Sequence, residues 1–168
     1  MATRKTNVKK LALLGLCASV ALVFSYIEAL IPPIIASVPG IKLGLPNIAI
    51  IFVLYKFGVK EAAAVSIVRI VIVSLLFGNA FALAYSIAGA CLSLIVMALL
   101  KKADFLSTVG VSVAGGVSHN IGQILVAMAV LGTAELGYYL IVLAISGTVA
   151  GIVVGACGNL AIKRLKNF

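Results

Sequence analysis

The stretch FALAYSIAGACLSLIVMALLKK, residues 81–102, decides the class of this protein. It holds twenty consecutive residues without a charge, residues 81–100, followed by Lys101 and Lys102. A helix that crosses the hydrocarbon core of a bilayer, about 30 Å thick, needs about 20 mostly apolar residues. The stretch therefore predicts a membrane-spanning helix that ends at a basic, water-facing border.

Five further apolar runs, together with this one, predict a bundle of six transmembrane helices. The six runs cover about residues 11–31, 45–57, 61–77, 81–100, 108–131 and 138–162. The 168 residues are 64% hydrophobic and 10% charged, whereas soluble domains are about 25% charged. Because the runs are continuously apolar rather than alternating, helices are favoured over the strands of a membrane barrel. We expect one all-α integral membrane domain over residues 1–168.

The basic residues predict which side of the membrane each connection faces. Six spans place 11 of the 13 lysines and arginines on one side: Arg4, Lys5, Lys9, Lys10, Lys56, Lys60, Lys101, Lys102, Lys163, Arg164 and Lys166. Cytoplasmic connections are rich in Lys and Arg, so this side, with both termini, is expected to be cytoplasmic. The same placement accounts for the net charge of +9 without a nucleic-acid partner. We expect a multi-pass protein of a bacterial plasma membrane, surrounded by the lipid bilayer.

The first run also has the basic beginning of a signal peptide. Signal peptides have an apolar region of about 7–15 residues, and this run has about 20. We therefore expect it to remain as the first helix of the bundle.

Two basic residues depart from the topology pattern. Lys42 lies in PGIKLGLPN, residues 39–47, an irregular connection on the predicted outer side, and Arg69 lies inside the third run. Ionisable groups within a bilayer are costly and often mark a functional site. Other polar side chains fall near the midplane or in the outer half: Asn47, Asn79, His119, Asn120 and Gln123. The seven together predict a pocket, open to the outside, that binds a small anionic substrate.

Each of these residues also has a structural alternative. Arg69 could form an ion pair with Glu28, and Lys42 could reach the membrane interface as an anchor. The polar residues of the fifth run could hydrogen-bond neighbouring helices. The functional and the structural interpretations both stay open at the level of the sequence.

Small residues spaced by four predict close helix packing. Gly147, Gly151 and Gly155 form one such line in the last run, and packing within the chain is expected there. The first run carries two lines, which could pack internally or contact a partner protein: Gly15, Cys17, Ser19, Ala21 and Ser25.

The sequence argues against an enzyme. Magnesium-diphosphate chemistry needs several carboxylates at one site, but the four acidic residues are dispersed: Glu28, Glu61, Asp104 and Glu135. The cysteines lie in three different runs without metal-binding spacing. No GxxxxGK[ST] loop is present. We expect no catalytic residues, no metal and no cofactor, so that any uphill transport would draw energy from an ion gradient or from partner subunits.

Four stretches connect the chain with a known family: PGIKLGLPNIAIIFVLYKFGVKEA, VSIVRIVIVSLLFG, AYSIAGACLSLIVMALLKK and GGVSHNIGQILVA. Over about residues 10–165 the chain resembles the Gx transporter family, also described as heptaprenyl diphosphate synthase component I. That family is similar to the substrate-binding S components of energy-coupling factor (ECF) vitamin transporters. The resemblance implies a six-helix bundle with an outward-facing site shaped partly by the loop after helix one. It also implies a transmembrane coupling subunit and two ATPase subunits as partners, contacted through helix one.

Two functions follow as expectations. The first is a substrate-binding membrane subunit for uptake of a small anionic molecule, vitamin-like or precursor-like. The alternative is a non-catalytic accessory subunit in isoprenoid diphosphate or quinone metabolism. Prenyl diphosphate synthases bind magnesium diphosphate through aspartate-rich motifs, and this chain has a single aspartate, Asp104.

Overall fold

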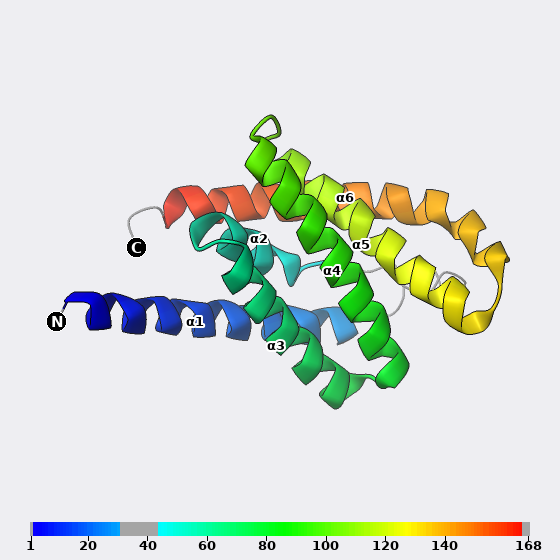
Figure 1. Cartoon of the computed structure of the whole chain (residues 1–168), viewed down its shortest axis with the longest axis horizontal. Helices are drawn as coiled ribbons and strands as arrows, with labels where there is room; N and C mark the ends of the chain where they lie inside the picture. The colour runs from blue at the N-terminus through cyan, green and yellow to red at the C-terminus, as the bar shows by residue number, and fades with distance from the viewer. Residues whose placement is uncertain (1, 31–43, 166–168) are drawn as a thin grey trace.

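The computed structural model describes residues 2–30 and 44–165, and the regular secondary structure within them is all helical. The elements are α1 (Ala2–Leu30), α2 (Asn47–Lys56), α3 (Val59–Phe77), α4 (Ala80–Ala103), α5 (Thr108–Leu131), the 3-10 helix η1 (Ala134–Tyr139) and α6 (Leu140–Arg164) (Figure 1). No strand occurs in this part of the chain. The predicted all-α class is confirmed.

The helix ends differ from the apolar runs where polar residues continue or cap a helix. α1 begins at Ala2, ahead of the predicted start at residue 11, because the basic N-terminal residues extend the helix beyond its apolar part. α4 runs on to Ala103. The next residue, Asp104, caps the helix with a left-handed φ of 53°. The Ser107 side chain then accepts a hydrogen bond of 3.2 Å from the Gly110 amide at the start of α5.

Four helical segments of the described residues are long and apolar enough to cross a membrane: Val8–Leu30, Ala80–Ala103, Thr108–Leu131 and Ala134–Arg164. α2 has only 10 residues, and α3 carries three charged residues, Lys60, Glu61 and Arg69. The bundle is also covered with aliphatic side chains, such as Leu75 at 80% exposure. These features indicate a membrane protein, whose apolar outer surface faces lipid.

The short helix α2 forms the centre of the core. Residues 49–54 are all buried, as expected of a helix that is apolar around its whole circumference. It packs against α1, α3 and α6. At 1.5 Å per residue its 10 residues extend for only about 15 Å, half of a hydrocarbon core. α2 therefore starts inside the bundle, at Asn47, instead of at its surface.

Glycines bring α6 into backbone contact with α5. A Cβ atom added at Gly151 would lie 2.5 Å from Val113 Cα, and one added at Gly116 would lie 2.5 Å from the Gly147 carbonyl oxygen. No real side chain fits at such distances, so only glycine permits this approach. The predicted glycine line of the last run thus packs within the chain.

Basic residues gather at one end of the bundle, which we call the basic end. Lys10 of α1 forms an ion pair with Glu61 of α3, and Lys101 Nζ donates a 2.7 Å hydrogen bond to the Leu54 carbonyl of α2. The first residues of α1 and the last residues of α6 also lie at one end, on the left of Figure 1. The predicted clustering of basic connections on one side is therefore present in the fold.

The small residues of α1 divide between two faces. Cys17, Ala21 and Ser25 are buried, because this line faces α2 and α3, the helices that α1 contacts. Gly15 and Ser19 are exposed. The first line packs inside the bundle, and of the five predicted partner-contact residues only Gly15 and Ser19 are open to a partner.

Candidate functional site

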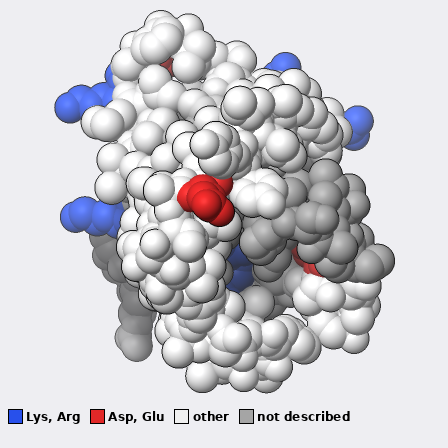
Figure 2. Space-filling view, turned by 90° about the vertical axis from the view of Figure 1, so that its right-hand side faces the viewer, with Lys and Arg blue, Asp and Glu red and all other residues white. Residues whose placement is uncertain are grey.

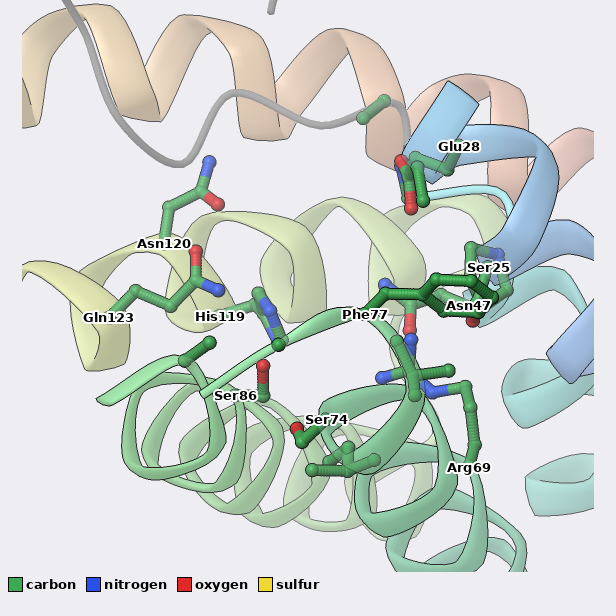
Figure 3. A pocket seen from close by; sticks show the side chains of 18 of the residues that line it. Ser25, Glu28, Asn47, Arg69, Ser74, Phe77, Ser86, His119, Asn120 and Gln123 are labelled. Carbon is green, nitrogen blue, oxygen red and sulfur yellow. The ribbon is translucent and has the colours of Figure 1, made fainter. Parts of the chain in front are cut away.

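A polar cavity of about 160 Å³ occupies the space beyond the N-terminus of α2. All six α-helices of the described residues contribute to its wall, which is formed by Ser25, Glu28, Ala29, Gly44, Pro46, Asn47, Arg69, Ile70, Val73, Ser74, Phe77, Gly78, Ala82, Ser86, Gly116, His119, Asn120, Gln123, Gly147 and Ala150. Figure 3 shows the polar side chains converging from opposite walls.

The cavity lies toward the end of the bundle opposite the basic end. Figure 2 looks at this opposite end and shows basic atoms at the bottom of a hollow, with acidic atoms nearby. Arg69 is the only lysine or arginine among the described residues of the cavity wall, and Glu28 is the only acidic one.

Arg69 is the central charged group of the cavity. Its Nε atom is buried and makes no hydrogen bond with any described residue. A buried charged donor without an acceptor is unfavourable by roughly 1–3 kcal/mol or more. Glu28 is near enough to interact with Arg69 electrostatically. Nε is therefore a buried donor whose hydrogen bond no described residue satisfies.

Glu28 joins the end of α1 to the start of α2. Its carboxylate accepts a 2.5 Å hydrogen bond from the Gly44 amide. Gly44 has a φ of +71°, a conformation that favours glycine, and its carbonyl accepts a 2.9 Å hydrogen bond from the Asn47 amide. This turn directs the N-terminal end of α2 into the cavity, where the helix dipole favours negative charge.

Asn120 on α5 is held by α6. Its Nδ2 atom donates a 2.7 Å hydrogen bond to the Leu143 carbonyl and lies 3.4 Å from Ser146 Oγ. Because a carbonyl only accepts, the amide nitrogen must face Leu143, and Oδ1 is left as an acceptor. Figure 3 shows this oxygen on the side of Gln123.

A glycine on α4, Gly89, lies against His119 and Gln123 of α5. A Cβ atom added at Gly89 would lie 2.9 Å from the Gln123 Cγ atom and 3.0 Å from the His119 Cε1 atom. Both side chains therefore rest on the bare backbone of α4. His119 and Gln123, four residues apart on one helix, face the same cavity.

Five of the seven predicted substrate-binding residues line the cavity: Asn47, Arg69, His119, Asn120 and Gln123. Asn79 lies outside this wall, because its side chain caps α4 and accepts a 2.8 Å hydrogen bond from the Ala82 amide. Lys42 lies outside the described residues. In the described part of the chain no three His, Cys, Asp or Glu residues form a group that could hold a metal ion.

Sequence reasoning missed the wall residues Gly44, Ser74 and Phe77 and assigned Ser25, which also lines the cavity, to a partner contact. Phe77 lies on the line of four-residue steps that runs from Arg69 through Val73, so a helical projection from that arginine could have found it. Ser74, five residues from Arg69, lies on a different line of the helix. Gly44 contributes its backbone amide, and the only signal of this in the sequence is that the residue is a glycine.

The model of the family described as heptaprenyl diphosphate synthase component I covers residues 17–161, a range that includes the whole cavity wall. No curated protein and no solved structure matches the chain.

Proposed function

The chain belongs to the heptaprenyl diphosphate synthase component I family, and from this premise we propose that it is a substrate-binding membrane subunit for a small anionic molecule. One observation supports this function above all others. The Arg69 guanidinium lines a polar cavity, and its Nε atom has no hydrogen-bond acceptor among the described residues. An anionic ligand would supply the missing acceptor.

The proposal includes all six α-helices in the membrane, with the basic end in the cytoplasm and the cavity open to the outside. The positive-inside rule supports this orientation. α2 needs no full span, since other helices bury it. Of the charged residues in α3, Lys60 and Glu61 belong to its first turn, beside the basic end, and Arg69 faces the cavity.

Uptake would need energy from other subunits, and we propose a transmembrane coupling subunit with two ATPase subunits. The exposed face of α1 is the proposed contact. It combines Gly15 and Ser19, which permit close backbone approach, with exposed aliphatic residues such as Leu11 and Leu16. The resemblance to ECF S components that the sequence suggests makes such a module the first to test.

Thermal unfolding in lipid nanodiscs, with a panel of vitamins and their precursors, tests the binding function. At about 100 times its Kd a ligand stabilises the folded state by roughly 2.7 kcal/mol, or several degrees. We expect one compound to raise the Tm of the wild type and of Lys102→Ala, which alters the exposed basic end, but not of Arg69→Ala. The function is wrong if no compound acts, or if Arg69→Ala responds like the wild type.

The family description favours a second candidate, a non-catalytic accessory subunit of a prenyl diphosphate synthase. The single aspartate of this chain fits an accessory role better than a catalytic one. Affinity purification from native membranes separates the two candidates. Co-purification of an ATPase pair supports the transport subunit, whereas co-purification of a soluble, aspartate-rich synthase supports the accessory subunit.

A further inference from the structure

We infer that the cavity binds a small monocarboxylate that has a hydrogen-bond donor at its other end. This inference rests on the proposed function and specifies its ligand. Three properties of the cavity support it: its balance of charge, the free atom of Arg69, and the fixed amide of Asn120.

The first property is the balance of charge. Arg69 supplies one positive charge, and Glu28 places a negative charge on the same wall. Unit charges near a protein surface interact by several kcal/mol at about 4 Å. A ligand with one negative charge pairs with the guanidinium. A diphosphate would bring further negative charges toward Glu28, with no second lysine or arginine among the described wall residues to balance them.

The second property is the position of the free donor on Arg69. Nε and the neighbouring terminal nitrogen of a guanidinium form two parallel N–H groups, which match the two oxygens of a carboxylate. Nε is the atom that is buried and makes no hydrogen bond with a described residue. A side-on carboxylate would satisfy it. A lysine could offer a point charge here but not this pair of donors.

The third property is the hydrogen-bonding character of the opposite wall. The Asn120 nitrogen is engaged by Leu143, so the side chain offers its oxygen to the cavity. This end therefore selects an N–H or O–H group on the ligand. The cavity, at about 160 Å³, is smaller than the roughly 300–1,000 Å³ of drug-sized pockets. A single ring or short chain between the two ends fits this size.

The experiment compares matched probes on the full-length protein in nanodiscs, with Tm and calorimetric Kd as readouts. The panel contains ring and short-chain monocarboxylates with a terminal hydroxyl or amine, each beside its neutral carboxamide and beside the acid without the donor. Inorganic pyrophosphate and isopentenyl diphosphate complete it. The protein variants are wild type, Arg69→Gln and Arg69→Lys.

We expect at least one carboxylate to stabilise the wild type, its carboxamide to have no effect, and the acid without the donor to bind more weakly. Arg69→Gln should abolish binding. Arg69→Lys should raise the Kd about tenfold, the loss of one hydrogen bond to a charged group. If either Arg69 variant fails to fold, the carboxylate and carboxamide comparison on the wild type decides the outcome.

Three results would overturn the inference. Equal binding of carboxylate and carboxamide would remove the role of charge. Stabilisation by a diphosphate alone, retained in Arg69→Lys and lost in Arg69→Gln, would refute the monocarboxylate but leave the proposed function in place. No stabilisation by any compound of either panel would overturn both.

Discussion

Asn120 on α5 donates a 2.7 Å hydrogen bond to the carbonyl oxygen of Leu143 on α6, so one side chain both lines the cavity and ties two helices together. Asn120→Leu keeps the volume but removes this bond, and we expect a loss of about 1–2 kcal/mol in the free energy of unfolding. Thermal unfolding in detergent measures it, as a decrease of roughly 2–8 °C in Tm.

Gln123→Leu is the matched control for this change. It removes an amide from the same helix and the same cavity, but no hydrogen bond from Gln123 to a described residue is found. Its Tm without ligand should change by less than half as much. Equal destabilisation by both variants would show that the α5–α6 bond contributes nothing specific.

Glycine at position 151 permits the contact between α5 and α6. In Gly151→Ala the new Cβ would lie 2.5 Å from Val113 Cα, a backbone atom, and the helices would have to separate. We expect destabilisation of about 1–3 kcal/mol, as for other overpacked cores, measured as a decrease in Tm.

Gly15→Ala provides the opposite case within the same protein. No atom lies within 4 Å of a Cβ at this position, so alanine adds helix propensity without a clash. We expect a stabilisation of about 0.5–1 kcal/mol. If both glycine variants shift Tm in the same direction, close packing at Gly151 is not what requires glycine there.

Glu28 should weaken the binding of any anion to Arg69. Glu28→Gln keeps an oxygen that can accept from the Gly44 amide but removes the negative charge. We expect anion affinity to rise by on the order of 1 kcal/mol, or roughly fivefold, with little change in Tm without ligand. Calorimetric titration measures this.

Glu28→Ala separates the two roles of this residue. It removes the charge and also the acceptor for Gly44. We therefore expect the free energy of unfolding without ligand to decrease by about 1 kcal/mol, which lowers Tm. A loss of anion binding in Glu28→Gln would mean that the carboxylate contacts the ligand favourably, contrary to the charge argument.

The proposed orientation can be tested by labelling single cysteines in cells. After replacement of Cys17, Cys91 and Cys157 by serine, Glu135→Cys should react with a membrane-impermeant maleimide in intact cells. Lys102→Cys should react only after permeabilisation. Both residues are exposed in the folded protein, so neither cysteine is shielded from the maleimide by the fold. The reverse labelling pattern would show that the topology is opposite to the proposed one and that the cavity faces the cytoplasm.

The helices could be predicted because each depends on a local apolar run. The close packing of α6 within the chain could be predicted because the spacing of Gly147, Gly151 and Gly155 is visible in the sequence. The burial of α2 could not. Hydropathy reports that residues 49–54 avoid water, but it does not distinguish lipid from protein as their surroundings. That α2 is a half-length central helix follows from contacts with α1 and α6, which are distant in sequence.

The residues of the candidate site could be predicted where a polar side chain lies deep within an apolar run. Arg69 and His119 are polar residues within apolar runs, and both line the cavity. Asn79 is different, because Asn immediately before an apolar run is also a helix-capping signal, and capping is its role here. The Glu28–Gly44 bond joins residues 16 positions apart in the sequence, which no spacing rule predicts.

The half-length of α2 has an electrical consequence. In the proposed orientation, its buried apolar residues form an apolar layer about 15 Å thick between the cavity and the basic end, and the cavity opens toward the other side. The transmembrane voltage, about 2.3 kcal/mol per charge at 100 mV, must fall mainly across this apolar layer. An anion that enters the cavity crosses little of that field, so its binding should be almost independent of membrane potential, and only its passage beyond α2 should depend on voltage.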